Sequence, residues 1–121
     1  MGKIKLKNIR TYSYHGCLIE ESKIGSNYRV NLEIKTDLSK SEISDDLKDT
    51  VNYILLNQIV VDEMAIRANL LENVARRIID SSMSKISSLT YIKVAVSKLN
   101  PPIGGDVQEV TVEIEGFRSI A

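Results

Sequence analysis

The fold of this chain is decided by the stretch Val94-Ala95-Val96-Ser97-Lys98-Leu99-Asn100-Pro101-Pro102-Ile103-Gly104-Gly105, which predicts a buried strand and the position of its end. Apolar side chains alternate with polar or small ones from Ile92 to Ser97, which is typical of a strand with one apolar face. Pro101 and Pro102 then remove two backbone donors, so the strand must end near Lys98.

Lys98 stands at the predicted end of this strand and has two interpretations. In the first, it is a solvated residue that keeps a strand edge from recruiting another chain, and the residues alone favour this interpretation. In the second, it lies in a cleft between chains, where partial desolvation would lower its pKa and suit it to proton transfer near neutral pH.

Length and charge limit the class of protein. With 121 residues, 43% of them hydrophobic, the chain is expected to form a single domain over 1–121 that buries roughly two thirds of its unfolded surface. Sixteen basic residues balance sixteen acidic ones, and no basic patch is dense enough to neutralise several phosphates at once. We therefore expect neither a nucleic-acid partner nor a membrane-surface partner.

A single cysteine and a single histidine limit the chemistry further. Cys17 cannot form an internal disulfide, so a reducing cytoplasm is the expected location. Together with His15 it cannot supply the usual three or four nitrogen and sulfur ligands of zinc, although carboxylates could still hold magnesium or calcium. Residues 1–8 alternate lysines with apolar residues and do not predict a signal peptide. The longest apolar segments, 53–56 and 59–61, are too short to cross a bilayer, so we expect a soluble protein.

The periodicity of apolar residues predicts four strands with two helices between them. We expect strands at about 3–14, 28–35, 92–98 and 107–117, helices at about 51–66 and 69–80, and a polar loop at 39–50. The order ββααββ predicts an α+β domain in which two helices cover one face of a four-stranded antiparallel sheet. The other face carries charges of both signs, so it can stand in water or line a wet channel.

Each predicted helix has an apolar face that should pack on the sheet. The first helix is expected to bury Val51, Ile54, Leu55 and Ile59, and the second Leu70, Leu71, Val74, Ala75, Ile78 and Ile79.

Four polar residues have a plain structural interpretation when each is considered alone. Glu72 stands three residues after Asn69, which is the spacing of a capping box at a helix start. Tyr53 is expected at a domain edge with its hydroxyl in water. His15, which precedes a glycine, could be a general base but more often such a residue hydrogen-bonds a turn, and Glu21 could be an ordinary surface carboxylate.

Considered together, these residues belong to a series of motifs whose order and spacing are informative. The series comprises Tyr14-His15-Gly16, Glu21, Gly25, Ser44-Asp45-Asp46, Asp49-Thr50-Val51-Asn52-Tyr53, Leu70-Leu71-Glu72, Val96-Ser97-Lys98 and Asn100-Pro101-Pro102-Ile103. With these motifs, which span nearly the whole chain, the sequence resembles the dihydroneopterin aldolase family of folate biosynthesis.

The resemblance implies an assembly and a reaction. Family members have the tunnelling fold, in which four subunits join their sheets into a barrel and two such rings stack into an octamer, with active sites at subunit boundaries. The charged sheet face would then line a wet tunnel. They cleave 7,8-dihydroneopterin by a retro-aldol reaction to 6-hydroxymethyl-7,8-dihydropterin and glycolaldehyde, and many also epimerise the side chain at C2′. They use no metal, no cofactor and no lysine Schiff base, because the imine of the dihydropterin ring is the electron sink.

The resemblance also implies roles for five residues of this sequence. Glu72 matches the glutamate that anchors the amino and ring N–H groups of the pterin, with help from the backbone of Leu71. Lys98 matches the lysine that donates and accepts the proton. Tyr53, from the neighbouring subunit, matches the tyrosine of proton transfer, and Glu21 matches a glutamate at the side-chain end of the site.

The sequence departs from the family pattern at two positions, and it leaves two alternative functions open. Ser22 and Ser26 stand where family members often have an arginine and a glutamine, so the conformation of the loop 15–27 is not specified, and His15 receives no catalytic role. The alternatives are a dihydroneopterin triphosphate 2′-epimerase, which would need basic residues at the mouth of the pocket, and a non-catalytic pterin-binding ring protein.

Overall fold

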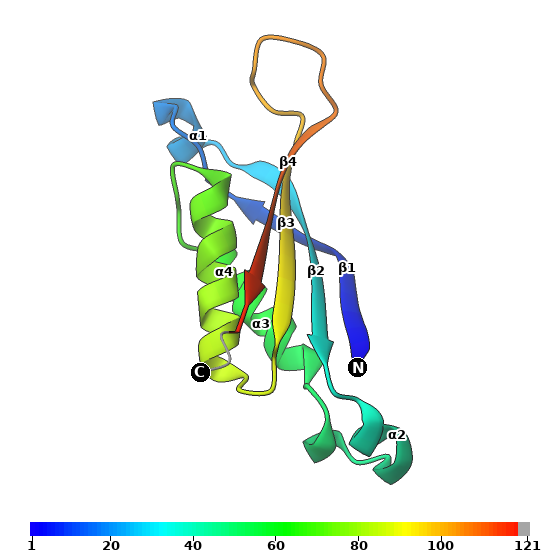
Figure 1. The fold of residues 1–121 in the computed structure, drawn as a ribbon. Helices are drawn as coiled ribbons and strands as arrows, with labels where there is room; N and C mark the ends of the chain where they lie inside the picture. Colours follow the sequence, from blue (N-terminus) through cyan, green and yellow to red (C-terminus); the bar gives the residue numbers. More distant parts are fainter. Residues whose placement is uncertain (119–121) are drawn as a thin grey trace.

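The computed structural model describes residues 1–118, which form a four-stranded sheet with helices on one side (Figure 1). The elements in chain order are β1 (Gly2–Ser13), α1 (Ile19–Lys23), β2 (Ser26–Thr36), α2 (Ser39–Ser44), a 3₁₀ turn (Leu47–Asp49), α3 (Tyr53–Met64), α4 (Leu71–Lys85), β3 (Tyr91–Leu99) and β4 (Glu109–Phe117). The predicted α+β class is confirmed, as are its four strands and two principal helices. No helix among the described residues is both long and apolar enough to span a membrane.

The strands lie in the order β1-β2-β3-β4, and every neighbouring pair is antiparallel. A bulge between Leu6 and Ile9 interrupts the register of β1 with β2. Asn8 lies in the bulge with φ 60°, and its N–H donates to Oδ1 of Asn31 at 2.8 Å, so the extra residue keeps a partner. β1 and β4 form the two edges of the sheet.

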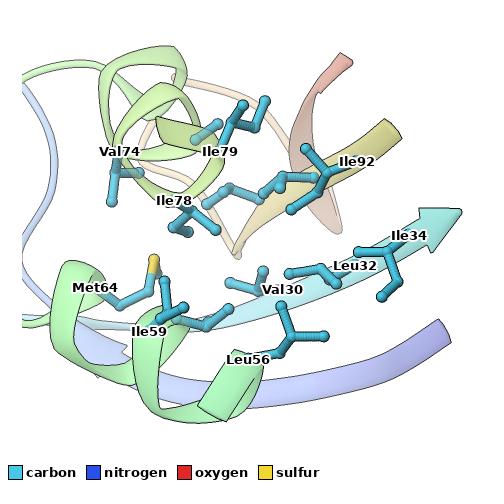
Figure 2. Close-up of a cluster of buried hydrophobic side chains, with 14 of the residues drawn as sticks. Val30, Leu32, Ile34, Leu56, Ile59, Met64, Val74, Ile78, Ile79 and Ile92 are labelled. Carbon is cyan, nitrogen blue, oxygen red and sulfur yellow. The ribbon is translucent and has the colours of Figure 1, made fainter. Parts of the chain in front are cut away.

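Alternation along the strands divides the sheet into a core face and an outer face. Val30, Leu32 and Ile34 of β2 are buried beneath α3 and α4, together with apolar residues of β3 (Figure 2). The outer face carries residues of opposite parity, which form rows across the strands, such as Lys5, Glu33, Lys93 and Glu115. The sequence therefore identified both faces of these strands correctly.

The helix α4 buries Val74, Ala75, Ile78 and Ile79, as predicted, but Leu70, also expected on this face, precedes the helix and is 51% exposed, and Leu71 is only partly buried. The prediction for α3 was also partly wrong. Ile54 is 70% exposed and Leu55 37% exposed, whereas the helix buries Leu56, Ile59, Val60 and Met64. The segment 53–61 is apolar on nearly every side, so its periodicity could not select the face that packs. Packing against β1 and α4 makes that choice.

Two connections contain helical turns that periodicity did not predict. Residues 39–50, expected as a loop, include α2 and the 3₁₀ turn, and α1 lies in the connection after β1. Local side-chain bonds hold the first region: Oδ1 of Asp37 accepts from the N–H of Ser39 at 2.9 Å, and Oδ1 of Asp46 accepts from the N–H of Lys48 at 3.1 Å. Such short turns depend on these bonds and have no buried stripe for a pattern to show.

Candidate active site

Lys98 is buried near the end of β3, with only 6% of its surface exposed. Its position in the strand places it on the core face, opposite Tyr28 of β2, whose ring centroid lies 5.7 Å from Nζ. Nζ donates a 2.9 Å hydrogen bond to the carbonyl oxygen of His15 and forms an ion pair with Oε2 of Glu21. Burial lowers the pKa of the Lys98 ammonium from its ordinary value. Its interpretation as a solvated strand terminator was therefore wrong.

Glu21 reaches Lys98 from the short helix α1, so it is not an ordinary surface carboxylate. Its Oε1 accepts from the N–H of Leu18 at 3.2 Å, while Oε2 contacts Lys98. Gly16 leaves the room that this carboxylate needs: it has φ 139°, and a Cβ at this position would overlap the Glu21 carboxylate.

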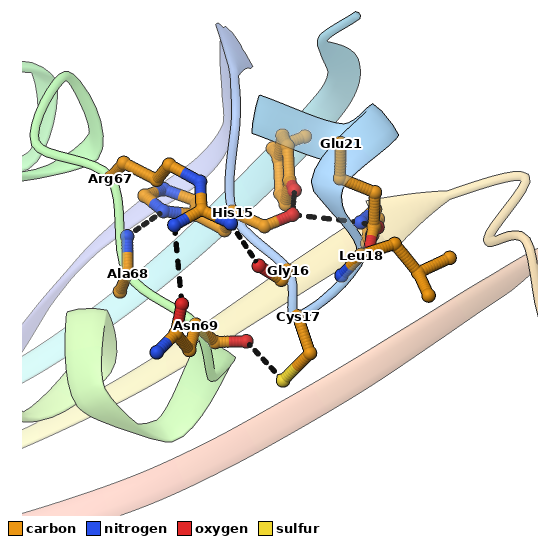
Figure 3. Close-up of polar contacts among 10 residues, drawn as sticks. His15, Gly16, Cys17, Leu18, Glu21, Arg67, Ala68 and Asn69 are labelled. Carbon is orange, nitrogen blue, oxygen red and sulfur yellow. Dashed lines mark hydrogen bonds and ion pairs between the residues drawn. The ribbon is translucent and has the colours of Figure 1, made fainter. Parts of the chain in front are cut away.

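Hydrogen bonds join the turn after β1 (residues 15–17) to the loop between α3 and α4 (residues 67–69), and we call this group of contacts the clasp (Figure 3). Nδ1 of His15 accepts from the N–H of Ala68 at 3.0 Å, and the N–H of Gly16 donates to the carbonyl oxygen of Ala68 at 2.9 Å. Nη2 of Arg67 donates to the carbonyl oxygen of Gly16 at 2.6 Å, and Sγ of Cys17 donates to that of Asn69 at 3.4 Å. The clasp therefore joins the segment that carries Glu21 to the segment that leads into Leu71 and Glu72.

His15 lies at the centre of this clasp and is fully buried. Its backbone carbonyl accepts from both Lys98 and the hydroxyl of Tyr28, the latter at 2.9 Å. Burial, with smaller contributions from the positive charges of Arg77, Lys98 and Arg67, lowers the pKa of the imidazole from 6.5 to about 4. The ring is therefore neutral at pH 7, which leaves Nδ1 free to accept the bond from Ala68. This arrangement confirms that the histidine holds a turn.

A groove of about 430 Å³ opens beside Lys98, and it brings together four of the five predicted site residues. Glu21 and Lys98 lie in its wall with Leu71 and Glu72. The remaining lining residues are Leu18, Asn69, Leu70, Pro101, Pro102, Ile103, Val110 and Val112. This combination of apolar walls and a few polar groups is typical of a site for a small molecule.

The capping box expected at Asn69 and Glu72 is absent from the described structure. The helix α4 begins at Leu71 with Leu70 as its N-cap residue, and no side chain caps it. Oδ1 of Asn69 instead accepts from Nη1 of Arg67 at 3.2 Å. The Glu72 carboxylate makes no hydrogen bond or ion pair with another of the residues 1–118, so it is free to bind a ligand in the groove.

Tyr53, the fifth predicted residue, lies outside this groove at the first position of α3. Oδ1 of Asn52 accepts from the N–H of Ile54 at 2.9 Å and thereby caps the helix. The Tyr53 side chain is 60% exposed, as its placement at a domain edge predicted. Within one copy of the chain, Tyr53 therefore does not line the groove that contains the Lys98 ammonium.

Sequence reasoning missed the groups that position the site. Arg67, Ala68 and Asn69 follow a helix in a short loop, and no motif or period identifies them as partners of the turn after β1. The apolar wall formed by Val110 and Val112 of β4 was also missed, because these residues lie near the other groove residues only in the folded sheet. The motif 100–103 did give a signal in the sequence, since its proline pair ends β3 beside Lys98.

Comparisons with known proteins give the family of the chain. The FolB family model, described as dihydroneopterin aldolase, matches residues 4–115. Dihydroneopterin aldolases from Streptococcus pyogenes serotype M18 and Bacillus subtilis strain 168 are 38% and 35% identical to this chain, and each alignment covers 98% of this chain and 100% of the relative.

Solved structures share the fold. A putative dihydroneopterin aldolase (FolB) from Vibrio cholerae superposes with a TM-score of 0.90 at 23% identity, covering 98% of both chains. The E. coli dihydroneopterin aldolase in complex with neopterin gives a TM-score of 0.87 at 22% identity, covering 96% of this chain and 99% of that one. A uricase from Bacillus fastidious gives 0.70 at 13% identity over 98% of this chain and 47% of its own.

The sheet, its helices and the groove beside Lys98 define a protein of the tunnelling-fold class. Within that class the chain belongs to the dihydroneopterin aldolase family, because the family model and the full-length relatives both cover it almost completely. Its enzyme class is that of a lyase of folate biosynthesis.

Proposed function

We propose that the groove beside Lys98 binds 7,8-dihydroneopterin, cleaves it by a retro-aldol reaction and also epimerises it at C2′ with the same residues. The observation that carries this proposal is the common lining of one groove by the Glu21–Lys98 pair and by Leu71 and Glu72. A volume of about 430 Å³ suits a bicyclic heterocycle with a short side arm.

Binding is assigned to the start of α4. The free Glu72 carboxylate accepts hydrogen bonds from the amino and ring N–H groups of the pterin, and the backbone of Leu71 contributes further polar contacts. Charge-assisted bonds of this kind contribute roughly 1.5 to 3 kcal/mol each. Anchoring the ring at this end directs the side arm of the substrate towards Lys98 and Glu21.

Proton transfer is assigned to Lys98 with Tyr53 and Glu21. A base removes the proton of the C2′ hydroxyl, the C1′–C2′ bond breaks, and its electron pair enters the imine of the dihydropterin ring. Glycolaldehyde leaves, and an acid returns a proton to C1′, which restores the imine and gives 6-hydroxymethyl-7,8-dihydropterin. The lowered pKa of Lys98 favours a group that both accepts and donates a proton. No metal and no Schiff base is required by this sequence of steps.

The site is completed, in this proposal, by Tyr53 from a neighbouring copy of the chain. Tyr53 is exposed and outside the groove of its own copy, so its hydroxyl is available to another subunit. Four copies of the single domain then join their sheets into a barrel, two such rings form an octamer, and the charged outer face lines the tunnel. A reducing cytoplasm suits the exposed and unpaired Cys17.

A complementation experiment tests the shared site. Tyr53→Phe and Lys98→Met subunits are each expected to release little glycolaldehyde from dihydroneopterin. When the two variants are unfolded, mixed in equal amounts and refolded together, about a quarter of the sites should contain both native residues if each site takes one from each copy. Recovery of about that fraction of wild-type activity supports the proposal, and no recovery from correctly assembled mixtures contradicts it.

The two alternatives make different predictions. A triphosphate epimerase needs cations at the mouth of the groove, whereas Lys98 is the only basic residue among the twelve described lining residues. Turnover of dihydroneopterin and of its triphosphate should therefore differ in favour of the former. A non-catalytic pterin-binding protein would bind pterin but would be indifferent to Lys98→Met.

A further inference from the structure

Tyr28 is buried behind Lys98 and does not belong to the lining of the groove. It lies on β2 directly opposite Lys98 of β3, and only 1% of its surface is exposed. Its ring meets the imidazole of His15 edge to face, with 5.2 Å between the ring centroids. Tyr28 is therefore a close neighbour of both residues at the inner wall of the site, although the groove itself does not expose it.

The hydroxyl of Tyr28 and the ammonium of Lys98 share one acceptor. Both donate to the backbone carbonyl oxygen of His15, and each donor atom lies 2.9 Å from that oxygen. A carbonyl oxygen has two lone pairs, so these two bonds use its full capacity. Burial raises the pKa of the Tyr28 phenol to about 12, so the hydroxyl stays protonated and continues to donate at neutral pH.

The peptide group that contains this carbonyl is also held at its other end. The N–H of Gly16 belongs to the same planar unit and donates to the carbonyl oxygen of Ala68 at 2.9 Å. This bond resists rotation of the plane, so the directions of the two lone pairs are set. With the hydroxyl of Tyr28 on one lone pair, Nζ of Lys98 is left with the other.

Two acceptors determine the direction in which Lys98 can exchange a proton. An ammonium group has three N–H donors, and the His15 carbonyl and Oε2 of Glu21 accept two of them. No third acceptor among residues 1–118 contacts Nζ, and Lys98 lines the groove. The remaining N–H, or the lone pair that replaces it in the neutral amine, is therefore available to a ligand in the groove.

We propose that Tyr28 is a positioning residue for Lys98: its hydroxyl occupies one lone pair of the His15 carbonyl and so holds Nζ on the other, with the third N–H facing the groove. Without the hydroxyl, the carbonyl has a free lone pair, and Nζ can shift towards it and away from the groove. This inference rests on the proposed function and adds a residue that acts on the proton-transfer group without touching the substrate.

The shared acceptor also affects the charge state of Lys98. The hydroxyl hydrogen of Tyr28 is the positive end of a bond dipole and points at the same oxygen as the ammonium, so the two donors compete. Removal of the hydroxyl strengthens the bond between the carbonyl and the ammonium, and a stronger hydrogen bond to the charged form raises the pKa of a lysine.

A plain structural interpretation of Tyr28 makes a different prediction. A buried tyrosine hydroxyl needs a hydrogen-bond partner, and the His15 carbonyl supplies one. In that interpretation, removal of the hydroxyl lowers the free energy of unfolding and changes neither the position nor the titration of Lys98.

Tyr28→Phe removes the hydroxyl and keeps the ring beside Lys98. We expect kcat for glycolaldehyde release to fall by about twofold to tenfold, which corresponds to one neutral hydrogen bond, while KM changes little because the anchor at the start of α4 is intact. The NMR signal of the Lys98 Cε, assigned by its absence in Lys98→Met, should titrate at higher pH than in the wild type. Tyr91→Phe is the matched control: it removes a 2.7 Å hydrogen bond from another buried tyrosine hydroxyl, to Glu115, and should change neither quantity.

A double-mutant cycle tests whether Tyr28 acts through Lys98. In a Lys98→Met background, Tyr28→Phe should lower the residual kcat no further, whereas an independent effect would multiply with that of Lys98→Met. The free energy of unfolding of each variant, measured in urea, separates a loss of stability from the effect on turnover.

Two outcomes would overturn the proposal. If Tyr28→Phe kept the wild-type kcat and the wild-type titration of Lys98, the hydroxyl would have only a structural role. If its full effect on kcat persisted in the Lys98→Met background, Tyr28 would act by another route. The NMR titration does not require turnover, so a wild type that releases no glycolaldehyde, but whose Lys98 titration depends on Tyr28, contradicts only the proposed function.

Discussion

Lys98 and His15 are 83 positions apart, yet Nζ of the lysine donates a 2.9 Å hydrogen bond to the backbone carbonyl oxygen of the histidine. The imidazole of the same histidine accepts from Ala68 in the loop that leads into α4. One buried residue therefore contacts both the proposed proton-transfer group and the loop that precedes the proposed anchor at Glu72.

Lys98→Met removes the amine and keeps most of the volume of the side chain. We expect kcat to fall by about a hundredfold to ten-thousandfold, the range for loss of a general acid-base group. Affinity for 6-hydroxymethyl-7,8-dihydropterin should stay close to that of the wild type, because the start of α4 still anchors the ring. Glycolaldehyde release and equilibrium binding measure the two effects, with Lys85→Met as the matched control. A variant that turns over normally would contradict the role assigned to Lys98.

Glu72→Gln removes the negative charge of the proposed anchor. Loss of a charge-assisted bond of roughly 1.5 to 3 kcal/mol should raise KM by about tenfold to a hundredfold or more, with a smaller change in kcat. The free energy of unfolding should change little, because Glu72 is exposed and caps no helix in the described structure. Steady-state kinetics and urea unfolding test both expectations, and Glu42→Gln is the control. A large loss of stability without a change in KM would assign Glu72 a structural role.

Gly16→Ala should displace the Glu21 carboxylate, because the new Cβ would occupy its position. We expect lower turnover together with a loss of stability from the left-handed backbone at φ 139°. Gly104→Ala is a matched control, since Gly104 also has a positive φ, at 80°, but no atom lies within 4 Å of its Cβ position. If both variants lost turnover equally, backbone strain and not the position of Glu21 would explain the effect.

Stability should depend on pH through His15. The folded pKa is lowered from 6.5 to about 4, so the unfolded chain binds more protons between these values and stability falls as pH drops from about 6.5 to about 4. The full difference corresponds to on the order of 3 kcal/mol. His15→Asn can still accept from Ala68 but does not titrate in this range. Its free energy of unfolding in urea should vary less with pH than that of the wild type, and parallel curves for the two proteins would contradict the prediction.

The sequence predicted the elements whose residues repeat with a clear period. The strands β2 and β3 and the helix α4 each bury one face, so their alternation or helical spacing determined both the element and its orientation. α3 differs because apolar residues surround it, and its packing against β1 and α4 decided that Leu56 and Val60 are buried while Ile54 is exposed. The short helices α1 and α2 bury no residue, so no pattern marks them.

The sequence likewise predicted only part of the candidate site. The motifs around Lys98, Glu21 and Glu72 pointed to the family, but each residue alone had a plain structural interpretation. Only the fold revealed that Lys98 is buried against Glu21 and that Glu72 is free, because these facts depend on side chains brought together from distant segments.

By itself, then, the amino-acid order determined the sheet, its two faces and the end of β3, since strand alternation and a proline pair act on neighbouring residues. The tertiary structure decided the groove and the clasp around His15, because a hydrogen bond between residues tens of positions apart forms only after the chain has packed. Sequence periodicity and motif spacing do not predict such contacts, although the chemistry of the site depends on these contacts.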